Sequence, residues 1–174
     1  SYSSDPANTP SLSIAEPPID PRTPLEQQRL AEYIERAQEQ VRQRPGDPVA
    51  HHMLAWAYRT LGQHQEAIAS FKEVIRLKPN DVVAHNNLGV VYRVSGQYQE
   101  AIAPYKEAFR IKPDDADAHN GLGYAYENLG RNNEAIGEYR EALRIDSNHP
   151  YARKNLNKLE QKLAEERLAY EQRL

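Results

Sequence analysis

The sequence matches itself three times over at a spacing of 34 residues. Segments 48–81, 82–115 and 116–149 align without a gap, and the same kinds of residue recur at matching positions. The matched sets are Leu54, Leu88 and Leu122; Tyr58, Tyr92 and Tyr126; Gly62, Gly96 and Gly130; Ala67, Ala101 and Ala135; and Phe71, Tyr105 and Tyr139. A repeat of this length predicts one small structural unit that is used three times and stacked on itself.

Each unit has the pattern of two antiparallel amphipathic helices. Leu54, Tyr58 and Leu61 recur at i, i+4 and i+7, which places them on one face of a first helix. Gly62 supplies the left-handed residue that ends this helix. A second apolar stripe at helical spacing follows, formed by Ala67, Ile68, Phe71, Val74 and Ile75. One helix pair alone cannot bury both of its faces, so the units must stack.

Proline and aspartate mark the boundaries between units. Pro79 and Pro113 end the second helices, because proline cannot continue a helical hydrogen-bond pattern. The aspartate two residues later, Asp81 or Asp115, is placed to cap the next helix, as Asp47 is for the first unit. A proline followed two residues later by an aspartate therefore precedes each of the three units.

These features resemble the tetratricopeptide repeat family across residues 48–149. In the second unit the family positions are held by Leu88, Gly89, Tyr92, Gly96, Ala101, Tyr105, Ala108 and Pro113. The departures from the family pattern are His51, His85 and His119 in place of a frequent tryptophan, and Ala55, Val74 and Ser147 in place of glycine, alanine and proline. The resemblance implies an all-α fold, a right-handed superhelical solenoid of helix-turn-helix repeats.

The repeat frame extends past both ends of the three units. Ile34 lies in the register of Ile68, so the helix that Thr23 caps is expected to be the second half of a repeat. At the other end Leu156 takes the place of Leu54. A single helix with a charged outer face is expected to cap the solenoid there.

We therefore divide the chain into six parts. Six of the twelve prolines lie in the first 24 residues, which excludes a helix or a central strand and predicts an extended tail. The parts are the tail at 1–22, a half-repeat helix at 23–46, repeats at 47–80, 81–114 and 115–148, and a capping helix at 149–174.

The composition argues against several classes of protein. A formal charge of −3 and a pI near 6.1 argue against nucleic acid as a partner. Cysteine is absent, and no apolar run approaches the roughly 20 residues of a membrane span. The chain starts at Ser1 without an initiator methionine or an apolar signal region. Two interpretations follow, a targeting segment removed from an exported or tethered protein, or a trimmed chain.

No cofactor, metal or catalytic site is expected. His51, His85 and His119 repeat regularly, but equivalent residues on stacked helices lie roughly 10 Å apart, whereas ligands lie about 2 Å from a shared metal. The glycines Gly121 and Gly123 lie inside a predicted helix with no strand before it, so they do not form a phosphate loop. No nucleophile and base stand together, so we expect a protein that is not an enzyme.

Three carboxylates gather in the turn before the third unit, at Asp114, Asp115 and Asp117. One interpretation is a contact to Ca²⁺, and the other is helix capping with favourable charge at a helix N-terminus. We favour capping, because the glycine and the distal glutamate of a calcium loop are missing.

The family resemblance also implies a partner-binding face, since the first helix of each unit lines the concave side of the solenoid. The residues at these positions are His52, Trp56, Arg59, Asn86, Asn87, Val90, Arg93, Asn120, Tyr124 and Glu127. Trp56, Val90 and Tyr124 form an apolar row, and the arginines and amides beside it offer hydrogen bonds to a peptide. An alternative for Trp56 is packing against the helix at residues 23–44.

Some family members grip the C-terminal carboxylate of heat-shock chaperones with lysine, asparagine and arginine. Asn87 matches one such position, but His52, Trp56, Asn120 and Tyr124 stand where the other clamp residues belong. We therefore do not expect a co-chaperone.

Two hypotheses of different class follow. In the first, the chain is an adaptor or assembly scaffold that holds a peptide segment or helix of another protein in its groove. In the second, it is a structural protein that assembles with itself into oligomers or filaments. Its tail residues Tyr2, Leu12, Ile14 and Ile19 would then dock on the groove or end face of a neighbouring copy. In a third arrangement the tail folds back onto its own groove.

The self-assembly hypothesis predicts that removal of residues 1–22 lowers the molar mass of the particles, because the docking segment is lost. Light scattering of the full chain and of the shortened chain measures this directly. A monomer in both cases contradicts self-assembly.

Overall fold

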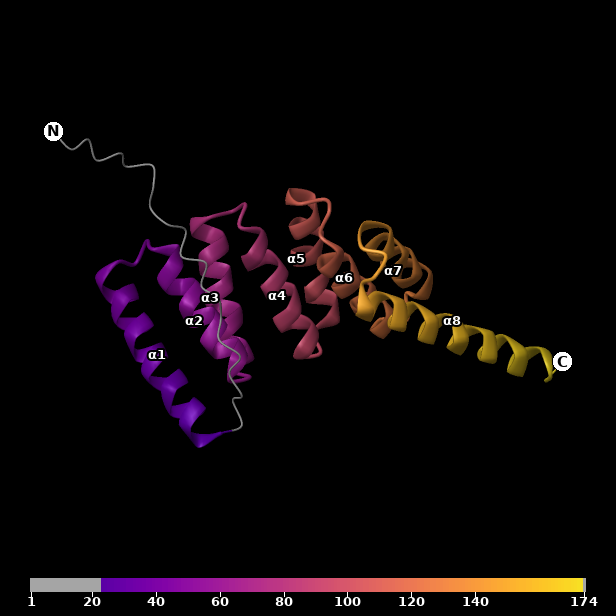
Figure 1. The fold of residues 1–174 in the computed structure, drawn as a ribbon, viewed down its shortest axis with the longest axis horizontal. Helices are drawn as coiled ribbons and strands as arrows, with labels where there is room; N and C mark the ends of the chain where they lie inside the picture. Colours follow the sequence, from indigo (N-terminus) through magenta and orange to yellow (C-terminus); the bar gives the residue numbers. More distant parts are fainter. Residues whose placement is uncertain (1–22, 174) are drawn as a thin grey trace.

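A computed structural model describes residues 23–173, and within them the chain forms eight helices and no strand. The helices are α1 (Pro24–Gln43), α2 (Pro48–Thr60), α3 (His64–Leu77), α4 (Val82–Val94), α5 (Tyr98–Ile111), α6 (Ala116–Asn128), α7 (Asn132–Ile145) and α8 (Pro150–Glu171). They stack side by side in chain order, and α8 continues past the end of the stack (Figure 1). The all-α solenoid expected from the repeats is confirmed. None of these eight helices combines the length and the apolar composition needed to cross a membrane.

The tail lies outside the described residues. The contacts expected of Tyr2, Leu12, Ile14 and Ile19 therefore remain predictions.

The predicted helix starts are formed by side-chain caps. Asp81 Oδ1 accepts a hydrogen bond from the Ala84 amide at 2.9 Å, and Asp115 Oδ1 accepts one from the Ala118 amide at 3.0 Å. Asp47 caps α2 by accepting from the amide two residues later, that of Val49, at 2.9 Å. Burial raises the pKa of the Asp81 carboxyl, but the Ala84 amide and His52 outweigh burial, so its pKa lies below the usual range.

The glycines that end the first helices adopt the left-handed conformation that the sequence predicted. The φ angles of Gly62, Gly96 and Gly130 are 72°, 77° and 74°. Side chains rarely adopt this conformation, so the sharp reversal between the two helices of a unit depends on glycine here.

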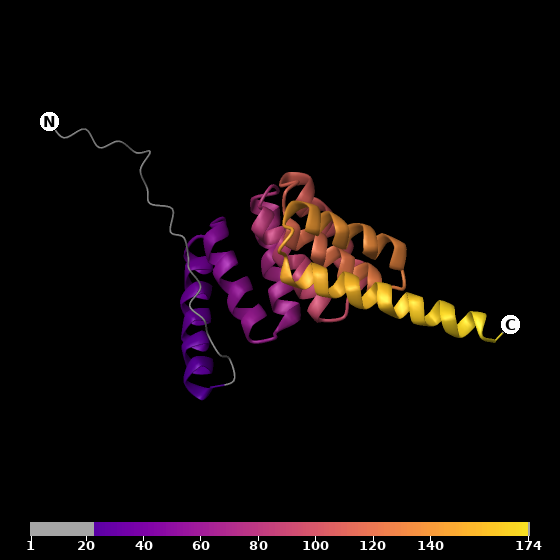
Figure 2. The ribbon, with the colours of Figure 1, turned by 45° about the vertical axis from the view of Figure 1, so that its right-hand side comes forward.

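The first helices form the inner layer of the solenoid. Besides its neighbours in the chain, α6 contacts both α4 and α8. Each of the second helices α3, α5 and α7 packs against the first helix before it and the first helix after it. Figure 2 shows the same stack turned by 45°. The helix α8 thus takes the place of a fourth first helix.

A large aromatic side chain from each second helix fills the space between the layers. Phe71, Tyr105 and Tyr139 are at most 1% exposed. Tyr105 lies against two glycines, Gly89 of its own unit and Gly121 of the next one. One ring therefore joins two neighbouring units.

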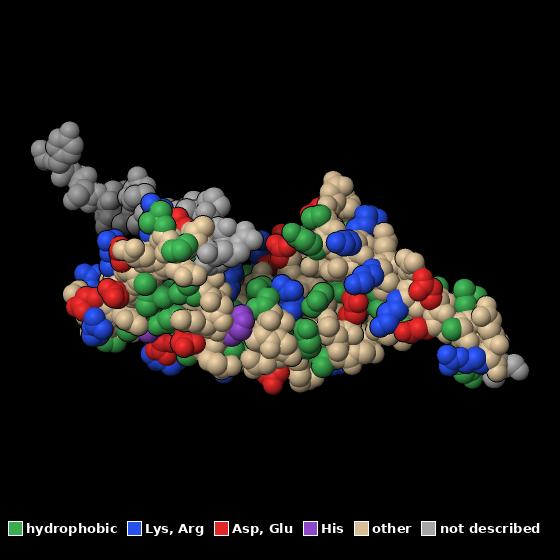
Figure 3. Space-filling model, turned by 90° about the horizontal axis from the view of Figure 1, so that it is seen from below, with side chains coloured by type: hydrophobic (Ala, Val, Ile, Leu, Met, Phe, Trp, Pro, Cys, Tyr) green, Lys and Arg blue, Asp and Glu red, His purple; other side chains and the backbone are tan. Residues whose placement is uncertain are grey.

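Only the first half of α8 packs against the solenoid. Ala152, Leu156 and Leu159 are buried, and Leu163 packs partly against the core. The rest of α8 projects beyond the body of the molecule, where acidic and basic side chains are interspersed (Figure 3).

Tyr139 carries a buried phenol that is bound to a carboxylate. Its hydroxyl donates a hydrogen bond to Glu127 Oε2 at 2.7 Å. Burial raises the pKa of Tyr139, and the Glu127 carboxylate raises it further because it opposes a second negative charge.

Gly121→Ala is expected to destabilise the fold by about 1–3 kcal/mol through overpacking. A Cβ at Gly121 would lie 2.4 Å from the ζ carbon of Tyr105, whose ring is enclosed. The matched control is Gly137→Ala on α7, where no atom lies within 4 Å, and it should gain about 0.5–1 kcal/mol. Chemical denaturation measures both variants, and equal stabilities would contradict the close packing of Tyr105.

Stability is expected to fall as the pH rises above about 10, the ordinary pKa of tyrosine. Because the pKa of Tyr139 is raised in the folded state, its stabilising contribution is complete below that pH and is lost above it. The free energy of unfolding should fall by about 1.4 kcal/mol per pH unit for this group. Tyr139→Phe should make the fall shallower, and an unchanged slope would contradict the assignment.

Candidate functional site

Five of the ten predicted partner-binding residues line one pocket on the inner layer. The pocket has a volume of about 420 Å³. The five are Asn86, Val90 and Arg93 from α4, and Asn120 and Tyr124 from α6. The 34-residue register thus places the central and C-terminal parts of the predicted row in a common cavity.

Other residues of this pocket were missed from the sequence. They are Tyr105, Asp117, Gly121, Tyr151 and Asn155. Asp117 and Tyr151 are 34 residues apart, and Asp117 lies three residues before Asn120 on the same helix face, so the register held a signal for both. Tyr105 comes from a second helix and reaches the pocket only because Gly121 has no side chain.

Arg93 is held against the aromatic wall of the pocket. Its guanidinium carbon lies 5.2 Å from the centre of the Tyr124 ring, and Nε donates to the Tyr105 hydroxyl at 3.3 Å. The Tyr124 ring also faces that of Tyr98, with the ring centres 6.3 Å apart. The pocket therefore offers a fixed positive charge beside an apolar surface.

Amide side chains supply the polar part of the pocket. Asn155 donates a hydrogen bond to Asn120 Oδ1 at 3.2 Å, which joins α8 to α6. This bond uses the Asn120 oxygen and not its amide N–H groups. Among residues 23–173 the side chain of Asn86 has no hydrogen-bonding partner. The pocket therefore keeps side-chain groups that can donate and accept further hydrogen bonds.

The N-terminal part of the predicted row does not line this pocket. His52 Nε2 lies 3.4 Å from Asp81 Oδ2, and Arg59 donates a hydrogen bond to Asn87. Trp56 packs edge-on against Tyr33 of α1, with the ring centres 5.5 Å apart. This is the alternative packing of Trp56 against the helix at residues 23–44.

Glu127 also lies outside the pocket. Its carboxylate accepts the hydrogen bond from the buried Tyr139 hydroxyl. The residue is therefore committed to the packing of α6 against α7.

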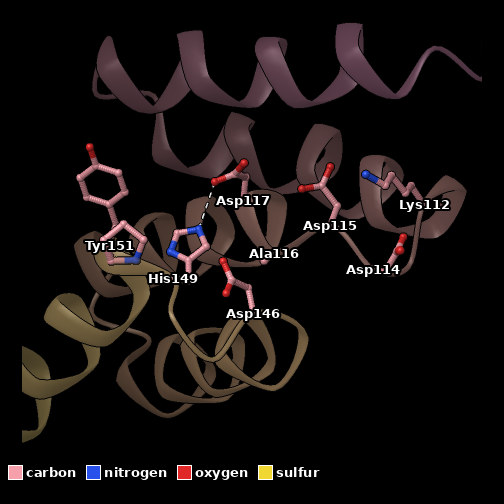
Figure 4. Close-up of a pocket in the computed structure, with 9 residues that line it drawn as sticks. Lys112, Asp114, Asp115, Ala116, Asp117, Asp146, His149 and Tyr151 are labelled. Carbon is pink, nitrogen blue, oxygen red and sulfur yellow. Dashed lines mark hydrogen bonds and ion pairs between the residues drawn. The ribbon is translucent and has the colours of Figure 1, made fainter.

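A second pocket, of about 320 Å³, adjoins the first at the start of α6 and α8 (Figure 4). Asp117 and Tyr151 line both pockets. Asp114, Asp115 and Asp146 add carboxylates, and His149 Nε2 lies 3.0 Å from Asp117 Oδ1. Over the described part of the chain, no group of three histidine, cysteine, aspartate or glutamate side chains has a geometry that holds a metal.

The repeated histidines bind groups of the protein. His51 and His85 donate from Nε2 to the carbonyl oxygens of Pro45 and Pro79, at 3.0 and 2.8 Å. His119 instead binds Glu138 at 2.7 Å and stacks on Phe109. These side chains tie each first helix to neighbouring segments.

Comparison with solved structures finds the same fold in several proteins. A fragment named MamA 41-end from Desulfovibrio magneticus RS-1 superposes with a TM-score of 0.75 and 24% identity, covering 84% of this chain and 83% of that chain. A crystal structure of a MamA protein gives a TM-score of 0.65 at 28% identity, covering 68% and 64%. The first TPR of Spaghetti (RPAP3), bound to an HSP90 peptide, gives 0.65 at 22% identity, covering 67% and 93%.

Comparison with sequences gives the family. No curated protein matches the chain. A TPR repeat profile matches residues 56–94 and 91–130, and a tetratricopeptide repeat profile matches residues 116–149. The matches together span 56–149, more than half of the sequence, and the chain belongs to the tetratricopeptide repeat family.

Proposed function

We propose that this chain is an adaptor or assembly scaffold that holds an extended segment of a partner protein in its inner groove. Tetratricopeptide repeats are in general non-catalytic modules for protein–protein interaction, and the fold supports that role. The observation that carries the finer proposal is the pocket formed by α4, α6 and α8, which combines aromatic, amide and arginine groups.

The size and lining of the pocket suit the side chains of a peptide. Its volume of about 420 Å³ falls in the range of about 300–1,000 Å³ that is usual for ligand sites. Val90 and Tyr124 offer apolar surface for one or two side chains of the partner. Asn86 and Asn120 lie 34 residues apart on neighbouring helices, so they can hydrogen-bond successive backbone groups of an extended chain.

The related structure with a bound HSP90 peptide supports a peptide as the type of ligand. The identity of the peptide does not transfer, because His52, Trp56, Asn120 and Tyr124 replace clamp residues and Asn87 is bound to Arg59. We therefore propose that the groove recognises residues within the partner's chain and not its C-terminal carboxylate.

Self-assembly through residues 1–22 is the alternative function. In the adaptor the groove holds a segment of a different protein, whereas in self-assembly it would hold a segment of another copy of this chain. The residues that line the pocket of α4, α6 and α8 carry the adaptor proposal, and they would serve either occupant.

Loss of apolar surface in the pocket is expected to weaken peptide binding at least tenfold, as truncation of a central anchor does. The probe is a set of linear peptides selected from a random display library against the unmodified chain. The test variant is Val90→Ala with Tyr124→Ala. The matched control is Val94→Ala with Tyr170→Ala, which removes the same atoms at positions that are 51% and 66% exposed.

Fluorescence polarisation measures the affinities, and circular dichroism checks that the helices persist. Trp56→Ala should have a smaller effect, because Trp56 packs on Tyr33 outside the pocket. Equal binding by the test and control variants, or a library that yields no peptide, would overturn the proposal.

A further inference from the structure

The N-terminal cap of α8 differs from those of the other first helices. In 34-residue register, Asp81, Asp115 and His149 occupy one position. Each accepts a hydrogen bond from the backbone amide three residues later, that of Ala84, Ala118 or Ala152, at 2.9, 3.0 and 3.1 Å. An imidazole thus replaces a carboxylate where the last helix begins.

The hydrogen bonds define the tautomer of His149. Nδ1 accepts from the Ala152 amide, so it carries no proton. The neutral ring therefore has its proton on Nε2, which donates to Asp117 Oδ1 at 3.0 Å (Figure 4). The His149 side chain is 5% exposed, and its hydrogen bond with the Ala152 amide is buried.

We propose that His149 is a positioning residue for the peptide groove, and that it holds the C-terminal wall of the groove only while its ring is neutral. This inference rests on the proposed function for its consequence in binding. The wall is formed by Tyr151 and Asn155, which lie on the first two turns of α8. Asn155 is the group that joins α8 to Asn120 in the pocket.

A second proton on His149 removes the cap. It must bind at Nδ1, where it would face the Ala152 N–H, so that two donors oppose each other. A positive charge at the start of α8 also opposes the helix dipole. An aspartate at this position, as in the other units, would not have this sensitivity near neutral pH.

Nearby charges act in both directions. Asp117 gains an ion pair when His149 is protonated, but its side chain is 81% exposed, so solvent screens that gain. Arg153 on α8 donates to the Ser147 carbonyl and opposes a positive ring. Among the remaining charged groups of the pocket, the carboxylates of Asp114, Asp115 and Asp146 attract a positive ring, and Lys112 repels it. Loss of an enclosed hydrogen bond outweighs screened attraction, so protonation should loosen the first turn of α8.

Hydrogen exchange at the Ala152 amide tests the inference without any ligand. The protection factor of the Ala152 amide should fall roughly fivefold, the effect of losing a helix cap. This fall is expected as the pH is lowered from 8 to 5, the range in which histidine changes charge. His149→Asn keeps a neutral cap and should abolish this pH dependence. His149→Ala should show low protection at every pH in that range.

Peptide affinity provides the second readout, with a selected peptide that contains no histidine. The affinity for the peptide should fall as the pH is lowered from 8 to 5 in the unmodified chain, and it should stay constant in His149→Asn. Asp47→Ala is the matched control, because it removes the cap of α2, a helix that does not line the pocket. This variant should keep the unmodified pH profile.

The outcomes separate the two proposals. If no peptide binds but Ala152 exchange follows His149 as expected, the groove function fails and the role of His149 in holding α8 stands. If peptides bind and His149→Asn keeps the pH dependence of the unmodified chain, the inference about His149 fails. Higher protection of Ala152 at low pH would also overturn it, because the ion pair with Asp117 would then dominate.

Discussion

An aromatic ring between neighbouring units holds the layers of this solenoid in register. Tyr105 extends from α5 and touches Gly89 of α4 and Gly121 of α6, so one side chain fixes the distance between two first helices. The ring fills the space that a Cβ would need, and the helices approach closely only because those positions are glycine. The same two helices carry the inner pocket, and Tyr105 and Gly121 themselves line it, so its shape depends on this contact.

Most of the fold was predictable because its signals are local and repeat. The cap at Asp81, the left-handed Gly96 and the spacing of Leu88 and Tyr92 each describe one turn of chain, and three copies remove ambiguity. Agreement between local signals and the global repeat is what makes a sequence specify one structure. The solenoid follows because a single helix pair leaves a face uncovered.

The site was predictable only where it obeys the repeat. Val90 and Tyr124 share a register, and the sequence placed both on the inner face where the pocket lies, whereas Tyr151 and Asn155 lie on α8, where the repeat pattern weakens. Trp56 shows the reverse case, since its register is regular but its ring packs edge-on against Tyr33 of α1 and does not line the pocket. Such contacts join segments that no periodic rule relates, so a folded structure is needed to find them.

Departures from the repeat also give the groove a direction. Val49, Val83, Asp117 and Tyr151 occupy one register, so this position changes from apolar to acidic and then aromatic along the chain. The departure at the end matters because, within residues 23–173, α8 packs mainly on α7 and α6, whereas an inner helix such as α4 has neighbours on both sides. A weakened start of α4 is compensated by packing, but α8 has fewer contacts to replace a lost cap. Under the proposal for His149, the replacement of aspartate therefore acts on a helix that has fewer neighbours than α4 or α6 to hold its first turn in place.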